Sequence, residues 1–174
     1  MKKLFYVMAG FAIVLLVLYT YLGGFTEPDV TVTTSKTMYV AGQPYEGSVE
    51  DEAMGKLFQR AAQVLEQNEL EGMLGNIYYN DPDKSGDSIR AFIGVIVPDS
   101  AAKLPAGYEL RAVPGDRKVV RAEVNARVQV APQKLYAAVF EYAKEEKLKL
   151  EEFYLEWFPA EDQGVLEVPV KGGN

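Results

Sequence analysis

The chain has 174 residues, of which 18 are lysine or arginine and 25 are aspartate or glutamate, and it contains neither histidine nor cysteine. The absence of these two residue types excludes Ser-His-Asp triads, cysteine nucleophiles, disulfide bonds and ordinary zinc sites. Any catalysis would therefore depend on carboxylates, lysine, tyrosine, hydroxyl groups or a metal ion held by oxygen atoms.

A run of 22 residues without a charged side chain, Leu4 to Phe25, predicts a transmembrane helix near the N-terminus. At ~1.5 Å per residue this helix reaches ~33 Å, which matches a hydrocarbon core of ~30 Å. The alternative is a cleavable signal peptide, whose apolar region is usually only ~7–15 residues long and ends in a small-x-small site. Because the run is longer and residues 21–25 offer a poor cleavage site, we expect an uncleaved anchor at residues 1–25.

The charges on either side of this helix predict its orientation. Lys2 and Lys3 precede it, whereas Glu27 and Asp29 follow it, and the positive side normally stays in the cytoplasm. We therefore expect a single-pass protein whose domain, residues 26–174, lies outside the cytoplasm, in the periplasm if the protein is bacterial. That domain carries 16 basic and 25 acidic residues, a net charge of −9, which argues against a nucleic acid partner.

The elements expected after the anchor indicate an α+β domain. Val30 to Val40 is rich in β-formers, and Ser48 can cap a helix with apolar residues at helical spacing. The later expected elements are strands at Met73–Asn80 and Ser88–Val97, a hairpin of Glu109–Val113 and Lys118–Asn125, a helix with Pro132 in its first turn, and strands at Glu152–Phe158 and Val165–Val170. Both halves thus follow the order strand, helix, strand, strand. This order predicts two pseudo-symmetric βαββ units, with both helices on one face of an antiparallel sheet and a groove on the other face.

The segment Asp81 to Asp87 begins like a calcium-binding loop, with oxygen ligands at positions 1, 3 and 5 and glycine at position 6. However, its twelfth position is Phe92, where such a loop requires a bidentate glutamate. We therefore expect a polar turn and no metal site.

The most informative segment for a binding site is the predicted strand at residues 152–158. Side chains alternate along a strand, so two faces can be separated. The residues expected to pack beneath the helices are Phe153, Leu155 and Trp157. The residues expected to line the groove are Glu152, Tyr154, Glu156 and Phe158. In the first half Tyr78 takes the equivalent face, where we expect it across the groove from Glu156.

Two interpretations of this groove face remain open. A carboxylate between aromatic side chains suits a groove that holds a cation or a flat apolar molecule. The alternative is an exposed acidic face with incidental aromatic residues. For Tyr136 and Phe140 on the second helix, we expect core packing rather than a place at the border of the groove.

Several segments in order carry a family resemblance. They are Val30-Thr31-Val32, Tyr78-Tyr79-Asn80-Asp81-Pro82, Arg90 with Gly94, Leu155-Glu156-Trp157-Phe158, and Pro169-Val170. With the N-terminal membrane helix, they make the chain resemble the GyrI-like small-molecule-binding domains. The resemblance is to their membrane-anchored branch in particular, which includes a testis-expressed receptor for ER-phagy.

The resemblance implies a tandem βαββ fold whose central cleft binds a small cationic or amphipathic molecule, without a cofactor. The cleft glutamate of the family matches Glu156, and the tyrosine that follows it is replaced here by Phe158. Glu152 is a second candidate because Glu152-Phe153-Tyr154 also fits a Glu-x-Tyr pattern. Two alternative functions follow from the same features: a hydrolase of electrophilic small molecules that uses the same glutamate, and a non-catalytic interaction module.

Overall fold

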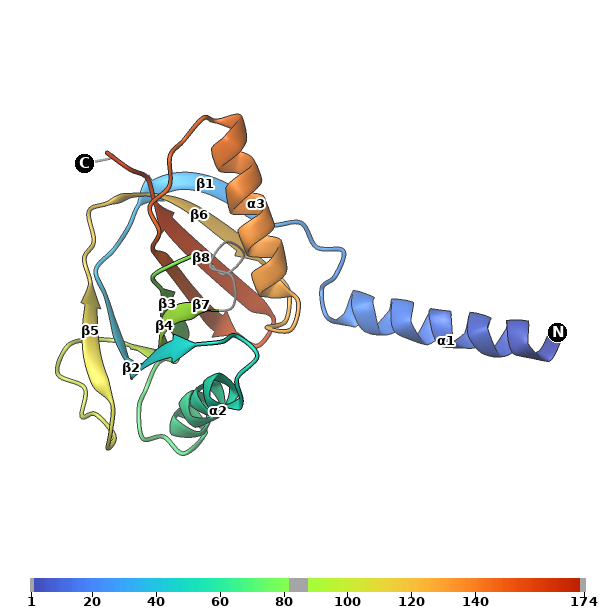
Figure 1. Cartoon of the computed structure of the whole chain (residues 1–174), viewed down its shortest axis with the longest axis horizontal. Helices are drawn as coiled ribbons and strands as arrows, with labels where there is room; N and C mark the ends of the chain where they lie inside the picture. The colour runs from blue at the N-terminus through green and yellow to red at the C-terminus, as the bar shows by residue number, and fades with distance from the viewer. Residues whose placement is uncertain (1, 82–87, 173–174) are drawn as a thin grey trace.

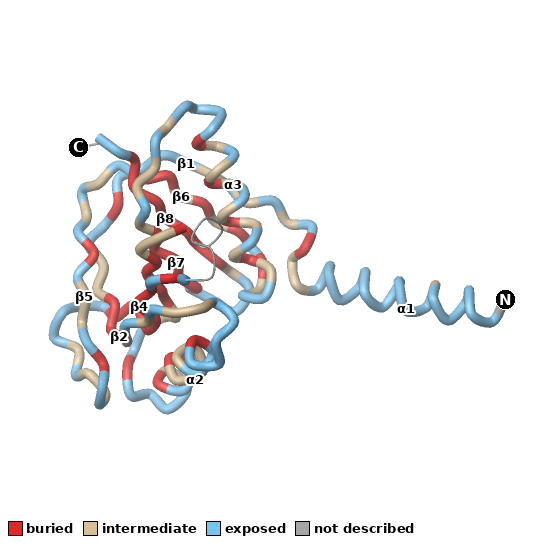
Figure 2. The backbone as a smooth tube through the Cα atoms, viewed as in Figure 1, coloured by how far each residue is buried: buried red, intermediate tan, exposed pale blue. Residues whose placement is uncertain are grey.

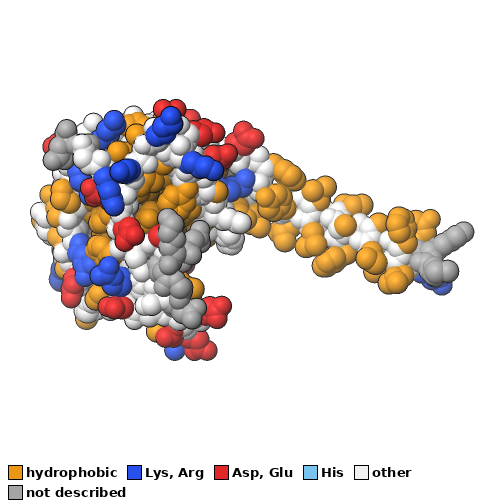
Figure 3. Space-filling view, turned by 45° about the horizontal axis from the view of Figure 1, so that its top comes forward, with side chains coloured by type: hydrophobic (Ala, Val, Ile, Leu, Met, Phe, Trp, Pro, Cys, Tyr) orange, Lys and Arg blue, Asp and Glu red, His pale blue; other side chains and the backbone are white. Residues whose placement is uncertain are grey.

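The computed structural model describes residues 2–81 and 88–172. Its first element, helix α1 (Lys2–Tyr21), projects away from the other elements (Figure 1). The large apolar side chains of α1 are exposed, from 43% for Tyr19 to 70% for Tyr6, and they surround the helix in Figure 3. The helix is long and apolar enough to cross a membrane, a property that signal sequences share.

The elements that follow form one antiparallel sheet of eight strands, with two helices packed on one of its faces (Figure 1). The strands lie in the order β1-β6-β8-β7-β3-β4-β2-β5. Their bounds are β1 Asp29–Thr34, β2 Met38–Gly47, β3 Met73–Tyr78, β4 Ile89–Val97, β5 Glu109–Val113, β6 Lys118–Val124, β7 Tyr154–Ala160 and β8 Gln163–Pro169. The two packed helices are α2 (Glu52–Glu66) and α3 (Ala131–Glu145). The expected α+β class is confirmed.

The two halves of the sheet have the same order of elements. The first half contains β2, α2, β3 and β4, and the second contains β6, α3, β7 and β8. The halves join where β3 lies beside β7, so the sheet is pseudo-symmetric about this central pair. The observed arrangement matches the expected pair of βαββ units with both helices on one face.

The expected hairpin of Glu109–Val113 and Lys118–Asn125 is wrong, because β5 and β6 pair with different strands. β5 pairs with β2 in the first half of the sheet, whereas β6 lies between β1 and β8 in the second half. Hydrogen bonds between the two connecting segments hold this arrangement. The N–H of Ser35 donates to the carbonyl of Arg117 (2.8 Å), and the N–H of Asp116 donates to the carbonyl of Ser35 (2.9 Å).

Two local details before β3 also differ from expectation. The β-rich stretch from Val30 to Val40 is divided between two strands, because the chain passes from one half of the sheet to the other between β1 and β2. The N-cap of α2 is Asp51 rather than Ser48, since the Asp51 carboxylate accepts a hydrogen bond from the N–H of Ala53 (2.8 Å). The Ser48 hydroxyl instead accepts from the N–H of Glu50 in the preceding turn.

The way the helices pack leaves the centre of the sheet partly uncovered. α2 packs chiefly on β4 and β2, and α3 packs chiefly on β6 and β8. Leu135 and Val139 of α3 are fully buried in this core, together with Val120 of β6 and Leu166 of β8. Figure 2 shows the buried residues gathered along the sheet. The central strands β3 and β7 therefore lie between the two helices, where a ligand could reach them.

Candidate ligand-binding cleft

A cleft of about 840 Å³ lies between the two helices, above the central strands. Its floor comes from β3 and β7, and its walls come from α2, α3 and the segments before them. The lining residues are Val49, Met54, Phe58, Leu74, Asn76, Tyr78, Ile89, Val128, Pro132, Gln133, Tyr136, Ala137, Phe140, Glu156 and Phe158. A pocket of this size and largely apolar lining, with a few polar groups, suits a drug-sized molecule.

The face on which the cleft lies corrects the sequence-based prediction. Glu156 and Phe158 point toward the helices, not away from them. Leu155 and Trp157, expected beneath the helices, are instead buried on the opposite face. The helices sit over the outer strands of each half, so the cleft forms between them on the helix face. On the other face, buried apolar side chains fill the corresponding space.

Glu156 lies at the floor of the cleft and is only 3% exposed. It pairs in register with Asn76 on β3. Burial raises the pKa of the Glu156 carboxyl to about 7, because a low-polarity environment disfavours the charged form, and a hydrogen bond from the Asn76 side chain acts in the opposite direction. Near neutral pH this carboxyl is therefore poised between its neutral and charged forms.

Tyr78 and Phe158 both line the cleft, as expected for groove residues. The expected position of Tyr78 across the groove from Glu156 is wrong, because β3 and β7 are adjacent strands. In the ladder Tyr78 pairs with Tyr154, and Glu156 pairs with Asn76. Tyr78 is consequently a diagonal neighbour of Glu156 on the same floor. Burial and the nearby Glu156 carboxylate both raise the pKa of Tyr78 well above 10.

Tyr154 and Glu152 do not line the cleft. Tyr154 is 2% exposed and packs behind Tyr136 and Phe140, with ring centroids 5.6 and 6.1 Å away. Burial, followed by the charges of Asp81 and Glu152, raises the pKa of the Tyr154 hydroxyl to about 12. Glu152 is exposed and precedes β7. Strand alternation predicted that all four residues share one face. Of the four, only Glu156 and Phe158 line the cleft.

Sequence reasoning missed two aromatic residues of the cleft wall, Tyr136 and Phe140 of α3. They are four residues apart, so they lie on one side of the helix. Both flank the buried stripe that contains Leu135 and Val139, and they turn toward the space between the helices. An aromatic pair at the margin of an apolar stripe was the available signal, although it fits core packing equally well.

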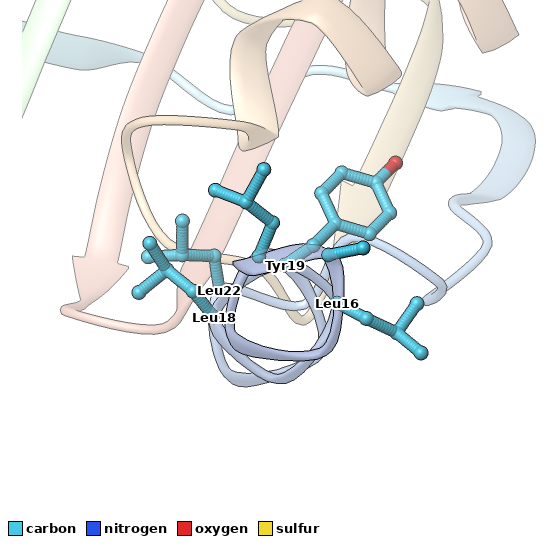
Figure 4. A pocket seen from close by; sticks show the side chains of 6 residues that line it. Leu16, Leu18, Tyr19 and Leu22 are labelled. Atoms are coloured by element: carbon cyan, nitrogen blue, oxygen red, sulfur yellow. The ribbon is translucent and has the colours of Figure 1, made fainter. Parts of the chain in front are cut away.

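In the described part of the chain, hollows also lie beside the cleft and along α1. One of about 360 Å³ shares Leu74, Val128 and Phe158 with the cleft and continues from it past Arg127. The other, of about 470 Å³, runs along α1 and is lined by side chains of the helix and its end, including Leu18, Tyr19 and Leu22 (Figure 4). Of these three hollows, the cleft has the largest volume and contains a buried carboxyl, that of Glu156, so it is the candidate site.

Within residues 2–81 and 88–172, no three acidic side chains come together in an arrangement that could hold a metal ion. Most of the polar turn predicted at Asp81 to Asp87 lies outside the described residues.

No family model and no curated protein matches the chain. Solved structures do. An integron cassette protein from the mobile metagenome of Vibrio cholerae, VCH_CASS2, has a TM-score of 0.64 at 13% identity, covering 84% of this chain and 99% of that chain. SAV2435 bound to tetraphenylphosphonium has a TM-score of 0.58 at 15% identity, covering 83% and 94%. The C-terminal domain of EcmrR has a TM-score of 0.57 at 11% identity, covering 83% and 98%.

These likenesses extend over most of this chain and nearly the whole of each neighbour, at identities that show the fold alone. The tandem βαββ sheet described above is the architecture that this chain shares with them. The chain therefore has the same α+β fold as these three solved proteins.

Proposed function

We propose that residues 26–174 form a domain that binds a small cationic or amphipathic molecule in the cleft, with Glu156 supplying the charge. The observation that carries this proposal is a buried carboxyl at the floor of a largely apolar cavity. Phe158, Tyr78 and Phe140 supply aromatic surface around it, and rings attract cations as well as flat apolar groups. SAV2435, which shares the fold, was solved with a lipophilic cation, tetraphenylphosphonium.

The energetics favour a cation over a neutral ligand of the same shape. Ionised Glu156 has lost most of its contact with water, and its hydrogen-bonding partner is the neutral amide of Asn76. A buried charge without a counter-charge is costly. A lipophilic cation offsets that cost and adds little desolvation cost of its own, because its charge is spread over a large apolar surface. Binding should therefore pull the Glu156 carboxyl toward its ionised form.

Calorimetry with tetraphenylphosphonium on the full chain in lipid nanodiscs tests the proposal, with empty nanodiscs as the reference for partitioning. We expect Glu156→Gln to weaken binding by about tenfold or more. Glu152→Gln is the matched control, because it makes the same change four residues away on an exposed side chain. Equal affinities for the wild type and Glu156→Gln would contradict the role of this carboxyl.

We further propose that α1 is an uncleaved, single-pass anchor with its N-terminus in the cytoplasm. The junction after α1 packs on the loop before α3, which supports retention of the helix. The N–H of Arg127 donates to the carbonyl of Leu22 (3.0 Å), and the Arg127 guanidinium donates to the Tyr21 hydroxyl (2.7 Å). The Lys134 ammonium donates to the carbonyl of Thr26 (2.9 Å).

The anchor can be tested by expression in a bacterial host. We expect the intact mass of the full 174-residue chain, retention in the membrane after alkaline carbonate washing, and digestion of the domain by protease added to spheroplasts. A mass lower by about the first 25 residues would show that the helix is a cleaved signal peptide. Protection of the domain in intact spheroplasts would contradict the orientation.

One alternative function uses the same cleft, namely hydrolysis of an electrophilic small molecule with Glu156 as the general base. The observation that favours it is a carboxyl buried at the floor of the cleft. Burial raises its pKa to about 7, which suits proton abstraction near neutral pH. Turnover of a strained-ring electrophile that disappears in Glu156→Gln would establish hydrolysis. If neither binding nor turnover depends on Glu156, a non-catalytic interaction module becomes the better account.

A further inference from the structure

The cleft has a further buried polar group besides the Glu156 carboxyl and the Asn76 amide of its floor, and it comes from the wall formed by α3. Tyr136 projects from α3 into the cleft. Its hydroxyl oxygen is buried and has no hydrogen-bond partner within the described part of the chain. Buried hydroxyls in folded proteins are nearly always hydrogen-bonded, so an unpaired one calls for an explanation.

The ring contacts of Tyr136 keep its hydroxyl in this position. The ring packs against Tyr154 (5.6 Å between centroids, 39° between planes) and against Phe140 (6.2 Å, 48°). Because both neighbours are part of the packed wall, the phenol cannot swing away without disturbing them. The hydroxyl is thus a fixed, buried polar group in the wall of the cleft.

The phenol is protonated at physiological pH and can donate a hydrogen bond. Burial, followed by the negative charge of Glu156 and the neighbouring Tyr78 and Tyr154, raises the pKa of Tyr136 well above 10. The amide of Asn76 is already paired with Glu156. The Tyr136 hydroxyl therefore remains a donor without an acceptor, and a bound ligand could supply that acceptor.

We propose that Tyr136 is a specificity-determining residue that selects ligands carrying an acceptor oxygen, such as an ether, hydroxyl or carbonyl, next to their cationic or amphipathic group. This inference rests on the proposed binding function and narrows its ligand class. A ligand without that oxygen leaves the phenol unpaired, whereas one with it forms a hydrogen bond away from competing water. A donor of this kind separates two otherwise equal ligands by about tenfold.

Two phosphonium probes of nearly equal shape and charge test the inference: n-butyltriphenylphosphonium and 2-methoxyethyltriphenylphosphonium. They differ by one CH₂ replaced with an ether oxygen. Both are titrated by calorimetry into the wild type and into Tyr136→Phe, as full chains in nanodiscs. The ratio of the two probe affinities is measured for each protein, and the two ratios are then compared. A difference in hydrophobicity between the probes affects both ratios equally and so cancels.

We expect the ether-to-butyl affinity ratio to be about tenfold higher in the wild type than in Tyr136→Phe. Tyr142→Phe is the matched control, because it deletes a phenol oxygen on the same helix at a residue outside the cleft lining. It should leave the ratio unchanged. The melting temperature of Tyr136→Phe should not fall, since an unpaired hydroxyl contributes no hydrogen bond to the fold.

The outcomes separate this inference from the proposed function. If neither probe binds the wild type, the proposed function fails and the inference fails with it. If both bind and Tyr136→Phe leaves their ratio unchanged, the inference is overturned while cation binding stands. A marked fall in the melting temperature of Tyr136→Phe would show that the hydroxyl has a partner in the fold, which also overturns it.

Discussion

Asn76 and Glu156 face each other in register on β3 and β7, the strands that join the two halves of the sheet. The amide hydrogen bond lowers the pKa of Glu156, which burial raises to about 7. We expect Asn76→Leu to raise that pKa further, so that cation affinity at pH 7 falls several-fold and recovers as the pH is raised. Titration of the Glu156 carboxyl carbon by NMR measures the shift directly, and an unchanged midpoint would contradict the pairing.

The buried carboxyl should also make stability depend on pH. The pKa of Glu156 is about 7 in the folded state, against an ordinary value of 4.5, so the folded state holds a proton that the unfolded state has lost. Stability from this group is fully present below pH 4.5, falls as the pH rises to 7, and is level above that. The total is roughly 3 kcal/mol.

Urea denaturation of the full chain in detergent at pH 5 and pH 8 measures this effect, with Glu156→Gln as the comparison. We expect the variant to gain free energy of unfolding relative to the wild type at pH 8 and to gain much less at pH 5. A difference between the two proteins that does not change with pH would show that Glu156 titrates at its ordinary value.

The sequence patterns predicted the elements and their repeated order well, because helical and strand periodicity are local properties. Pairing is not local. Pro114, Gly115 and Asp116 look like a hairpin turn, but the same residues also suit a bend between strands that diverge. The hydrogen bonds that decide between these outcomes come from Ser35, about 80 residues earlier in the chain.

The site was predicted in part for a similar reason. Alternation along residues 152–158 separates the face of Glu156 from that of Trp157, but it does not say which face the helices cover. Trp157 with the aliphatic residues around it looked like the helix-covered core, yet this cluster packs on the other face of the sheet. Tyr136 could be assigned to the cleft only once α3 was seen to pack on β6 and β8, at the edge of the uncovered central strands.

The face opposite the helices offers a test that leaves the cleft untouched. The carboxylate of Glu167, 5% exposed, lies 3.5 Å from the Arg121 guanidinium, which also stacks over Trp157 at 5.4 Å from the ring centroid. Burial raises the pKa of Glu167, and Arg121 opposes this rise. We expect Arg121→Leu to destabilise the fold by roughly 2–3 kcal/mol at pH 8, because it leaves a buried carboxylate without its partner.

At pH 5 the loss in Arg121→Leu should be smaller, since Glu167 then takes up a proton more readily than in the wild type. Urea denaturation at both pH values measures this, and tetraphenylphosphonium affinity serves as the internal control. Binding should be unchanged, because Arg121 is not among the residues that line the cleft. A loss of stability equal at the two pH values would show that the ion pair with Glu167 does not contribute.

The junction between α1 and the sheet depends on Gly23. Its φ of +80° belongs to the left-handed region that favours glycine, and a Cβ atom there would lie 2.6 Å from the carbonyl oxygen of Asn125. We expect Gly23→Ala to release the segment from the loop before α3, so that proteinase K cleaves residues 22–29 several-fold faster. Gly10→Ala is the matched control, because a Cβ at Gly10 meets nothing within 4 Å. Equal cleavage rates for the two variants would show that the hydrogen bonds between Arg127 and the end of α1 do not hold the helix to the domain. The anchor would then be joined to the sheet only by a free linker.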